Sequence, residues 1–241
     1  MAAFRKAQEL GSPGLELDVQ LCGSGELVVM HDASLNRTTG MDAAINHVSH
    51  SELRRLDAGS WFSPDFSSER IPLLSEVLEE FSGRLYIDIE LKSRLVKDDP
   101  LPLVLAKLLN GFLSGTGKHA LVSVSSFNPF ALASFKRAAP RIPTAIIWSA
   151  DAELPWYLRA GQGRWLSQSD YLKPVHSKAT SFSLVLSGKI GGYQVIPWVV
   201  DNAAHADELI DRGCDGVITN RPQDLMPAFA ARKSGKQTRL D

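Results

Sequence analysis

Acidic side chains interrupt two apolar stretches of this chain at alternate positions. The first stretch reads Leu-Glu-Leu-Asp-Val-Gln-Leu over residues 15–21, and the second reads Leu-Tyr-Ile-Asp-Ile-Glu-Leu-Lys over residues 85–92. Strand side chains alternate between two faces, so each stretch predicts a strand with one apolar face and one acidic face. Carboxylates gathered in an apolar interior are costly unless a positive group lies among them. A divalent metal with oxygen ligands is the simplest such group, which indicates a metal-assisted enzyme.

The two acidic faces would meet if both strands belong to one parallel barrel, whose active site lies at the carboxyl ends of its strands. Glu16 and Asp18 fall toward the end of the first predicted strand, and Glu90 and Lys92 fall at the end of the second. We therefore predict Glu16, Asp18 and Glu90 as ligands of Mg²⁺ or Ca²⁺, with positions left open for water and substrate. The alternative is an interior salt bridge of Lys92 with the acids, although one lysine cannot neutralise three carboxylates.

One histidine, His31, stands at the end of a short apolar run over residues 27–30. A single histidine is usually a surface or core residue, but the nearness of Glu16 and Asp18 in sequence favours a catalytic role. Imidazole can supply or take a proton at neutral pH beside a metal-bound phosphate. We expect Asp32 to orient the loop. Four further histidines in loop or helix contexts carry no such indication: His47, His50, His119 and His205.

Strand and helix patterns alternate along most of the chain. This alternation predicts a parallel sheet with right-handed crossovers. Leaving out the hairpin arm at 27–30, we count seven principal strands, and the chain begins with a helix. A closed barrel needs eight strands. We therefore predict an α/β fold, a TIM (β/α)8 barrel whose first strand is missing. A doubly wound open sheet would tolerate seven strands, but no GxGxxG or P-loop pattern marks its usual ligand site.

The predicted elements define one domain with an insertion. We assign residues 1–232 to a single barrel domain, residues from about 33 to 71 to an inserted subdomain, and residues 233–241 to a disordered polar tail. A structureless loop as long as the 33–71 segment would be unusual in a compact domain. Beyond the two acidic strands we predict strands at 121–126, 144–148, 171–174, 193–200 and 216–219, and helices at 73–81, 101–114, 128–139, 153–159, 177–187, 203–212 and 223–232.

The composition excludes several classes of protein. The chain has 241 residues and a formal net charge of −1, so it gives no support for a nucleic-acid or membrane-surface partner. No run approaches the roughly 18 apolar residues of a membrane span, and residues 1–10 lack the apolar segment of a signal peptide. Cys22 and Cys214 lie far apart, as expected for reduced thiols. These features fit a cytoplasmic protein with a small-molecule partner, and they do not indicate an oligomeric state.

A series of short segments is more specific as an ordered set than any one of its members. They read Glu-Leu-Asp-Val-Gln-Leu (16–21), Val-Val-Met-His-Asp-Ala-Ser-Leu-Asn-Arg-Thr-Thr (28–39), Gly-Ser-Trp-Phe-Ser-Pro (59–64), Ile-Glu-Leu-Lys (89–92), Val-Ser-Ser-Phe-Asn-Pro (124–129), Trp-Val-Val-Asp-Asn (198–202) and Asp-Gly-Val-Ile-Thr-Asn-Arg-Pro (215–222). This set, within residues 1 to about 227, closely resembles the glycerophosphodiester phosphodiesterase family.

The resemblance implies a barrel with a small insertion after its second strand. It implies that Glu16, Asp18 and Glu90 hold Mg²⁺ or Ca²⁺, and that Lys92 contacts the phosphate. Two histidines would act as general acid and base, the second being His31. A metal-bound glycerol hydroxyl would attack phosphorus, and water would open the resulting cyclic phosphate to give glycerol 3-phosphate and an alcohol. Two aromatic residues, Phe127 and Trp198, match positions near the family's pocket, or they belong to the core.

The beginning of the chain departs from the family pattern. The family opens with a strand carrying His-Arg-Gly and a following Pro-Glu-Asn, whereas here the segment at 1–7 matches the helix that comes next. We therefore expect Met1 to be an internal methionine and the truncated chain to be impaired and unstable without a partner. Two other functions stay open, a non-catalytic phosphodiester-binding barrel and a lyase acting on lysophospholipid or sphingolipid headgroups.

Overall fold

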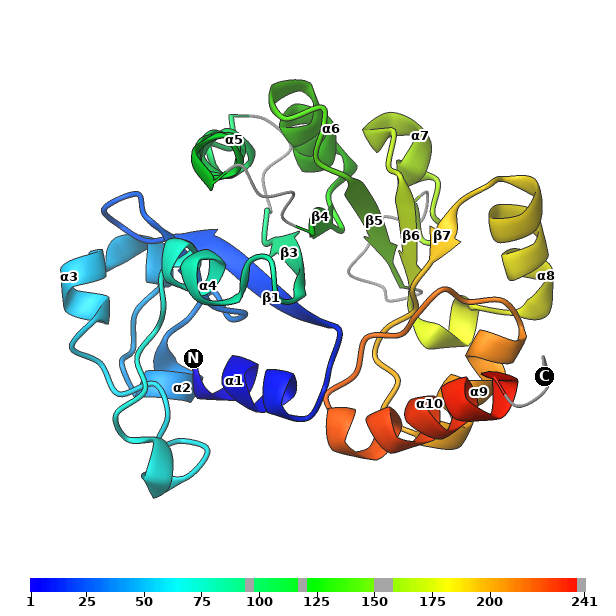
Figure 1. Cartoon of the computed structure of the whole chain (residues 1–241). Coiled ribbons are helices and arrows are strands. Elements are labelled where there is room, and N and C mark those ends of the chain that lie inside the picture. Colours follow the sequence, from blue (N-terminus) through cyan, green and yellow to red (C-terminus); the bar gives the residue numbers. More distant parts are fainter. Residues whose placement is uncertain (94–97, 117–120, 150–157, 238–241) are drawn as a thin grey trace.

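A computed structural model describes residues 1–93, 98–116, 121–149 and 158–237, and its centre is a curved, mostly parallel sheet (Figure 1). Among these described residues no strand ladder joins the last strand back to the first, so the sheet is open. β2 (Leu27–Val29) returns antiparallel to β1 and forms one edge. The parallel strands follow in the order β1 (Gly14–Leu21), β3 (Tyr86–Leu91), β4 (Val122–Ser126), β5 (Thr144–Trp148), β6 (Tyr171–Pro174) and β7 (Gln194–Val195).

The outer face of the sheet is apolar because every second residue of each strand packs against a helix. Leu17 of β1 and Ile89 of β3 lie in one buried cluster with Phe81, Leu105 and Phe135 from three of the helices. The alternate residues of the same strands face the interior, and there the acidic residues gather. The sequence pattern thus separates a packed outer layer from a polar interior.

Helices cover this outer layer. α6 begins at Pro129, and the side chain of Asn128 before it accepts hydrogen bonds from the main-chain N–H groups of Phe130 and Ala131. None of the helices in the described ranges combines the length and apolar character needed to cross a membrane. In the described ranges the α-helices outside the insertion are α1 (Ala2–Glu9), α4 (Leu74–Phe81), α5 (Leu101–Thr116), α6 (Pro129–Ala138), α7 (Gly163–Ser167), α8 (Ser181–Leu184), α9 (Ala203–Asp211) and α10 (Pro222–Gln237). A 3₁₀ helix, η4 (His176–Lys178), and a π-helix, η5 (Val185–Ile190), flank α8.

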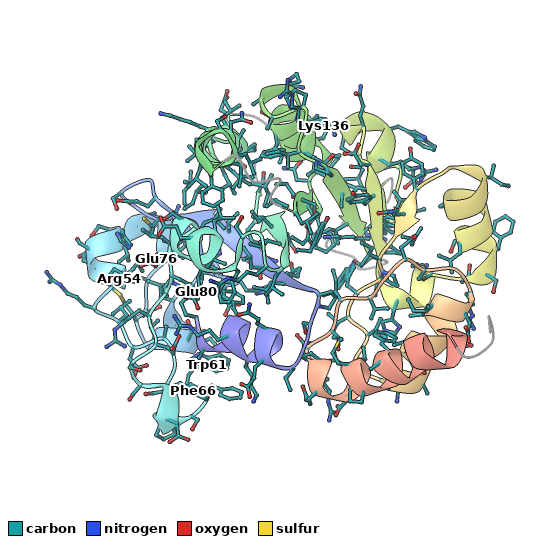
Figure 2. All side chains as sticks on the ribbon, in the orientation of Figure 1. Arg54, Trp61, Phe66, Glu76, Glu80 and Lys136 are labelled. Atoms are coloured by element: carbon teal, nitrogen blue, oxygen red, sulfur yellow. The ribbon has the colours of Figure 1, made fainter. Side chains whose placement is uncertain are left out.

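The segment between β2 and α4 has a hydrophobic cluster of its own, in which Leu35, Ile45 and Leu53 are buried. An ion pair between Arg54 and Glu76, with 3.0 Å between Nη1 and Oε1, ties this segment to α4. Figure 2 shows these two side chains near each other, with Trp61 and Phe66 at the outer end of the segment. The segment contains α2 (Asn36–Thr39), η1 (Ile45–His47), α3 (His50–Leu53) and η2 (Pro64–Phe66).

The end of the sheet differs from the sequence prediction. The strand expected at 193–200 is regular only over Gln194–Val195. Ile196 N and Trp198 N still donate to Leu172 O and Pro174 O of β6, but Pro174 has no N–H group to donate back, so the ladder is interrupted at this point. The strand expected at 216–219 is irregular, although Ile218 N donates to Pro197 O at 2.9 Å.

Three helix predictions also need correction or fall outside the structure. The helix expected at 177–187 is divided among η4, α8 and η5. The helix expected at 223–232 extends as α10 to Gln237. The helix expected at 153–159 falls mostly on residues 150–157, which lie outside the described residues.

Candidate active site

Three carboxylates meet on the interior face of β1 and β3. Asp18 and Glu90 are directly opposite each other in the parallel ladder, and Glu16 precedes Asp18 on the same face. One carboxylate oxygen from each of Glu16, Asp18 and Glu90 lies within 4.8 Å of the other two. The structure therefore brings together the three residues that the alternation in the sequence selected as metal ligands.

Lys92 lies beside this cluster. Its Nζ is 2.9 Å from Asp18 Oδ1 and 2.8 Å from Glu90 Oε1. Burial opposes the charge of Lys92, but attraction to Glu90 and Asp18 outweighs burial and raises the pKa of the ammonium group. The interior salt bridge considered above is thus present, but its two close contacts are to Asp18 and Glu90.

Glu16 is the member of the cluster that most lacks a compensating charge. Burial, together with the charges of Asp18 and Glu90, raises the pKa of Glu16 to about 8. Attraction to Lys173 and Lys92 offsets only part of that rise. A cation bound among the three carboxylates would remove this penalty, because it favours the charged form of each.

A buried lysine that the sequence analysis did not select lies in the same interior. Lys173 of β6 is 2% exposed and forms an ion pair with Asp88 of β3. Asp88 also accepts hydrogen bonds from Ser123 Oγ at 2.7 Å and from Ser125 Oγ at 3.3 Å. Burial lowers the pKa of Lys173 to about 7, against the attraction of Glu16. The period-two argument, applied to residues 171–174, would have placed Lys173 inside, but so short a strand shows little alternation.

The charges of this interior fit one divalent cation. Among the residues that the structure describes, its carboxylates are Glu16, Asp18, Asp88 and Glu90, and its ammonium groups are Lys92 and Lys173. Four negative charges against two positive charges leave an excess of two when all are ionised. Carboxylate oxygens are the ligands that Mg²⁺ and Ca²⁺ prefer, so the donor set and the charge both suit these ions.

His31 follows β2 and forms a dyad with Asp32. Its Nδ1 lies 2.8 Å from Asp32 Oδ1, and Arg37 Nε donates to Asp32 Oδ2 at 2.6 Å. Hydrogen bonds from Arg37 and His31 lower the pKa of Asp32, so this carboxylate stays ionised and orients the imidazole. The His31 side chain is 66% exposed. Burial raises the pKa of Glu90, and the charge of His31 offsets a smaller part of that rise.

Phe127 and Trp198 form an aromatic pair at the carboxyl ends of β4 and β7. Their ring centroids are 5.5 Å apart and the ring planes meet at 87°. Trp198 Nε1 donates to the carbonyl oxygen of Lys173 at 3.0 Å, which joins the pair to the polar interior. Both side chains are half-buried and lie outside the apolar core clusters. These two aromatic residues therefore lie beside the polar interior, and their contact with substrate stays a prediction.

Comparisons with known proteins identify the family of this chain. Residues 1–224 match the model of the glycerophosphoryl diester phosphodiesterase family. A glycerophosphodiester phosphodiesterase of Caldanaerobacter subterraneus subsp. tengcongensis is 32% identical over 227 residues, which cover 94% of this chain and 89% of the relative. A glycerophosphodiester phosphodiesterase of Bacillus altitudinis is 32% identical over 92% of this chain and 88% of its own length.

Solved structures show the same fold. An Oleispira antarctica phosphodiesterase in complex with sn-glycerol-3-phosphate superimposes with a TM-score of 0.79, at 28% identity, over 95% of this chain and 90% of its own. A glycerophosphodiester phosphodiesterase of Agrobacterium tumefaciens superimposes with a TM-score of 0.74 at 24% identity, over 93% and 90% of the two chains. These structures confirm the predicted TIM barrel fold, and the open sheet described above is consistent with a barrel that lacks one strand. The chain belongs to the glycerophosphoryl diester phosphodiesterase family of phosphoric diester hydrolases.

Proposed function

We propose that this chain uses one divalent cation to hydrolyse glycerophosphodiesters to glycerol 3-phosphate and an alcohol. The observation that carries the proposal is the interior carboxylate cluster, which has an excess of negative charge and oxygen ligands within 4.8 Å of one another. The Oleispira antarctica relative, solved in complex with sn-glycerol-3-phosphate, supports the same product here.

Glu16, Asp18 and Glu90 would hold the cation, because they supply hard oxygen ligands from two adjacent strands. When bound, Mg²⁺ or Ca²⁺ would polarise a phosphoryl oxygen and lower the pKa of a coordinated hydroxyl. The strands keep the carboxylates in place before substrate arrives, so little reorganisation accompanies the reaction.

Lys92 is placed to receive the phosphate. Its ammonium group contacts two of the carboxylates and stays charged. It can therefore stabilise the negative charge that develops on the phosphoryl oxygens. Lysine binds phosphate as a compact point charge with three donors. We assign Lys92 to binding the phosphodiester and stabilising its transition state.

His31 is the candidate for proton transfer. The ionised carboxylate of Asp32 accepts a hydrogen bond from Nδ1–H, so Nε2 is the nitrogen that exchanges a proton with the substrate. In the proposed reaction a glycerol hydroxyl attacks phosphorus, the bond to the alcohol oxygen breaks, and water then opens the cyclic phosphate. His31 transfers one of the protons that these steps move, and Phe127 and Trp198 contact the substrate at the rim.

The direct test is release of glycerol 3-phosphate from glycerophosphoethanolamine with Mg²⁺, with Ca²⁺ or with EDTA. Metal-dependent release that is lost in Glu90→Gln, with the fold retained, would support the proposal. A cyclic phosphate as the end product would favour the lyase instead. Equal release in EDTA would contradict the metal assignment, and no release with either ion would favour a non-catalytic phosphodiester-binding barrel.

A further inference from the structure

Gln20 is a buried polar side chain that the chemistry above does not use. It lies on β1 beyond Asp18 and is 9% exposed. Its Nε2 lies 2.8 Å from Met30 O, 3.2 Å from His31 O and 2.9 Å from Asp32 O. The two N–H bonds of this one amide group are therefore shared among three successive main-chain carbonyls at the start of the loop that carries His31.

These contacts begin where the strand ladder ends. Gln20 is opposite Val28 in the antiparallel pairing of β1 and β2, and Met30 N still donates to Asp18 O at 2.9 Å. Beyond Met30 the chain leaves β1. There the side-chain amide of Gln20, instead of the main chain of β1, donates hydrogen bonds to the carbonyl groups of the loop. Buried carbonyl groups that lose their donor cost free energy, so this amide favours one path for the loop.

We propose that Gln20 is a positioning residue that holds His31 at the carboxylate cluster. The inference rests on the proposed function, in which His31 transfers a proton. Asp32 orients the imidazole ring, whereas Gln20 holds the main chain from which the ring projects. β1 then carries two of the metal ligands and also the group that places the proton-transfer residue relative to them.

Gln20→Met tests this role, because methionine keeps the length of the side chain and removes both donors. Displacement of a catalytic group by about 1 Å can cost roughly 10²-fold in rate, so we expect kcat to fall about 10- to 100-fold. KM and the dissociation constant for Mg²⁺ should change less than about threefold, because Glu16 and Asp18 stay in place. Gln194→Met, at an exposed position of β7, is the matched control and should behave as the wild type.

A double-mutant cycle separates positioning from a general loss of stability. In the His31→Ala background, Gln20→Met should cause no further loss of kcat, because Gln20 acts only through His31. If Gln20→Met lowers kcat by the same factor with and without His31, the positioning role is wrong. An unchanged kcat in the single variant would overturn it equally.

Hydrogen exchange supplies a readout that does not depend on turnover. The amides of Met30 and Ile45, which donate to Asp18 O and Ala33 O, should exchange faster in Gln20→Met, while those of β3 should not. Gln20→Asn, one methylene shorter, is the milder variant if Gln20→Met does not fold, and it should show an intermediate effect. Unchanged exchange in the loop would overturn the inference. If the wild type releases no glycerol 3-phosphate, the proposed function fails, and the exchange data still decide whether Gln20 holds the loop.

Discussion

Asp18 and Glu90 lie opposite each other on β1 and β3, and the ammonium group of Lys92 touches both of their carboxylates. Glu16 lies on the same face of β1 as Asp18, and burial together with the charges of Asp18 and Glu90 raises its pKa to about 8. The charges of two potential ligands, Asp18 and Glu90, are therefore partly neutralised by Lys92. A bound cation would stabilise the ionised form of Glu16 most, because the pKa of Glu16 is raised.

Lys92→Met should separate metal binding from phosphate binding. Removing the ammonium group takes a competing charge away from Asp18 and Glu90, so Mg²⁺ should bind no more weakly than in the wild type. The rate kcat/KM should fall about 10- to 100-fold, the usual worth of a hydrogen bond to a charged group. Calorimetric titration with Mg²⁺ and an assay of glycerol 3-phosphate release measure the two effects.

The control for that variant is Lys136→Met. Lys136 lies on α6, on the outer side of the sheet (Figure 2), and pairs with Asp170 at 2.6 Å. Lys136→Met should leave both the affinity for Mg²⁺ and kcat/KM unchanged. Weaker Mg²⁺ binding in Lys92→Met alone would instead mean that Lys92 orders the carboxylates.

Metal affinity should depend on pH through Glu16. The raised pKa of about 8 means that the metal-free protein holds a proton on Glu16 below that pH, compared with the usual value of 4.5. A cation needs the carboxylate ionised, so binding releases this proton. The affinity for Mg²⁺ should therefore fall by about tenfold for each pH unit below about 8 and level off above it.

Titrations with Mg²⁺ between about pH 6 and about pH 9 would measure this slope. Glu16→Gln should remove most of it and also weaken binding, because the amide has no proton to lose and no charge to offer. A wild-type affinity that is flat over this range would show that the metal-free protein does not hold on Glu16 the proton that the ion is expected to displace.

The sequence was informative where one strand or two adjacent strands determine the geometry. Alternation along residues 15–21 and 85–92 was enough to group Glu16, Asp18 and Glu90, because a parallel ladder keeps residues of one face together. The apolar outer residues followed from the same pattern. Capping side chains such as Asn128 also lie where the sequence places helix starts.

Other features of the fold and of the candidate site could not be predicted, because they depend on contacts between residues far apart in the sequence. Lys173 contacts Asp88 although β4 and β5 lie between their two strands in the sheet. No local pattern of the short strand β6 reveals that partner. The bonds from Gln20 to the His31 loop depend on the path of the loop after β2. Pro174 of β6 has no N–H group to donate to the stretch after Val195, so β7 is shorter than its composition predicted.

Asp32→Asn should impair catalysis without affecting metal binding. Asp32 accepts from His31 Nδ1 and from Arg37, whereas an asparagine amide can turn its own N–H toward Nδ1 and reverse the tautomer of the ring. Acid–base steps contribute about 10²- to 10⁴-fold, so kcat should fall by at least about 10²-fold. Arg37→Gln should have a smaller effect, because Asp32 stays ionised beside His31. An Asp32→Asn variant with most of the wild-type kcat would show that the dyad has no catalytic role.

Lys173 should matter for stability through Asp88. Lys173→Met leaves a buried carboxylate whose remaining hydrogen-bond donors are the hydroxyl groups of Ser123 and Ser125, and breaking a buried ion pair in this way costs about 3–5 kcal/mol. Adding Asp88→Asn removes the unpaired charge and keeps an oxygen for the serines, so the double variant should unfold at higher urea than Lys173→Met alone. Lys136→Met, which breaks a more exposed ion pair, should cost at most about 1 kcal/mol. Urea unfolding of the metal-free proteins measures the stability of the three variants. A Lys173→Met variant as stable as the wild type would mean that the ion pair with Lys173 is not needed to stabilise the buried Asp88 carboxylate.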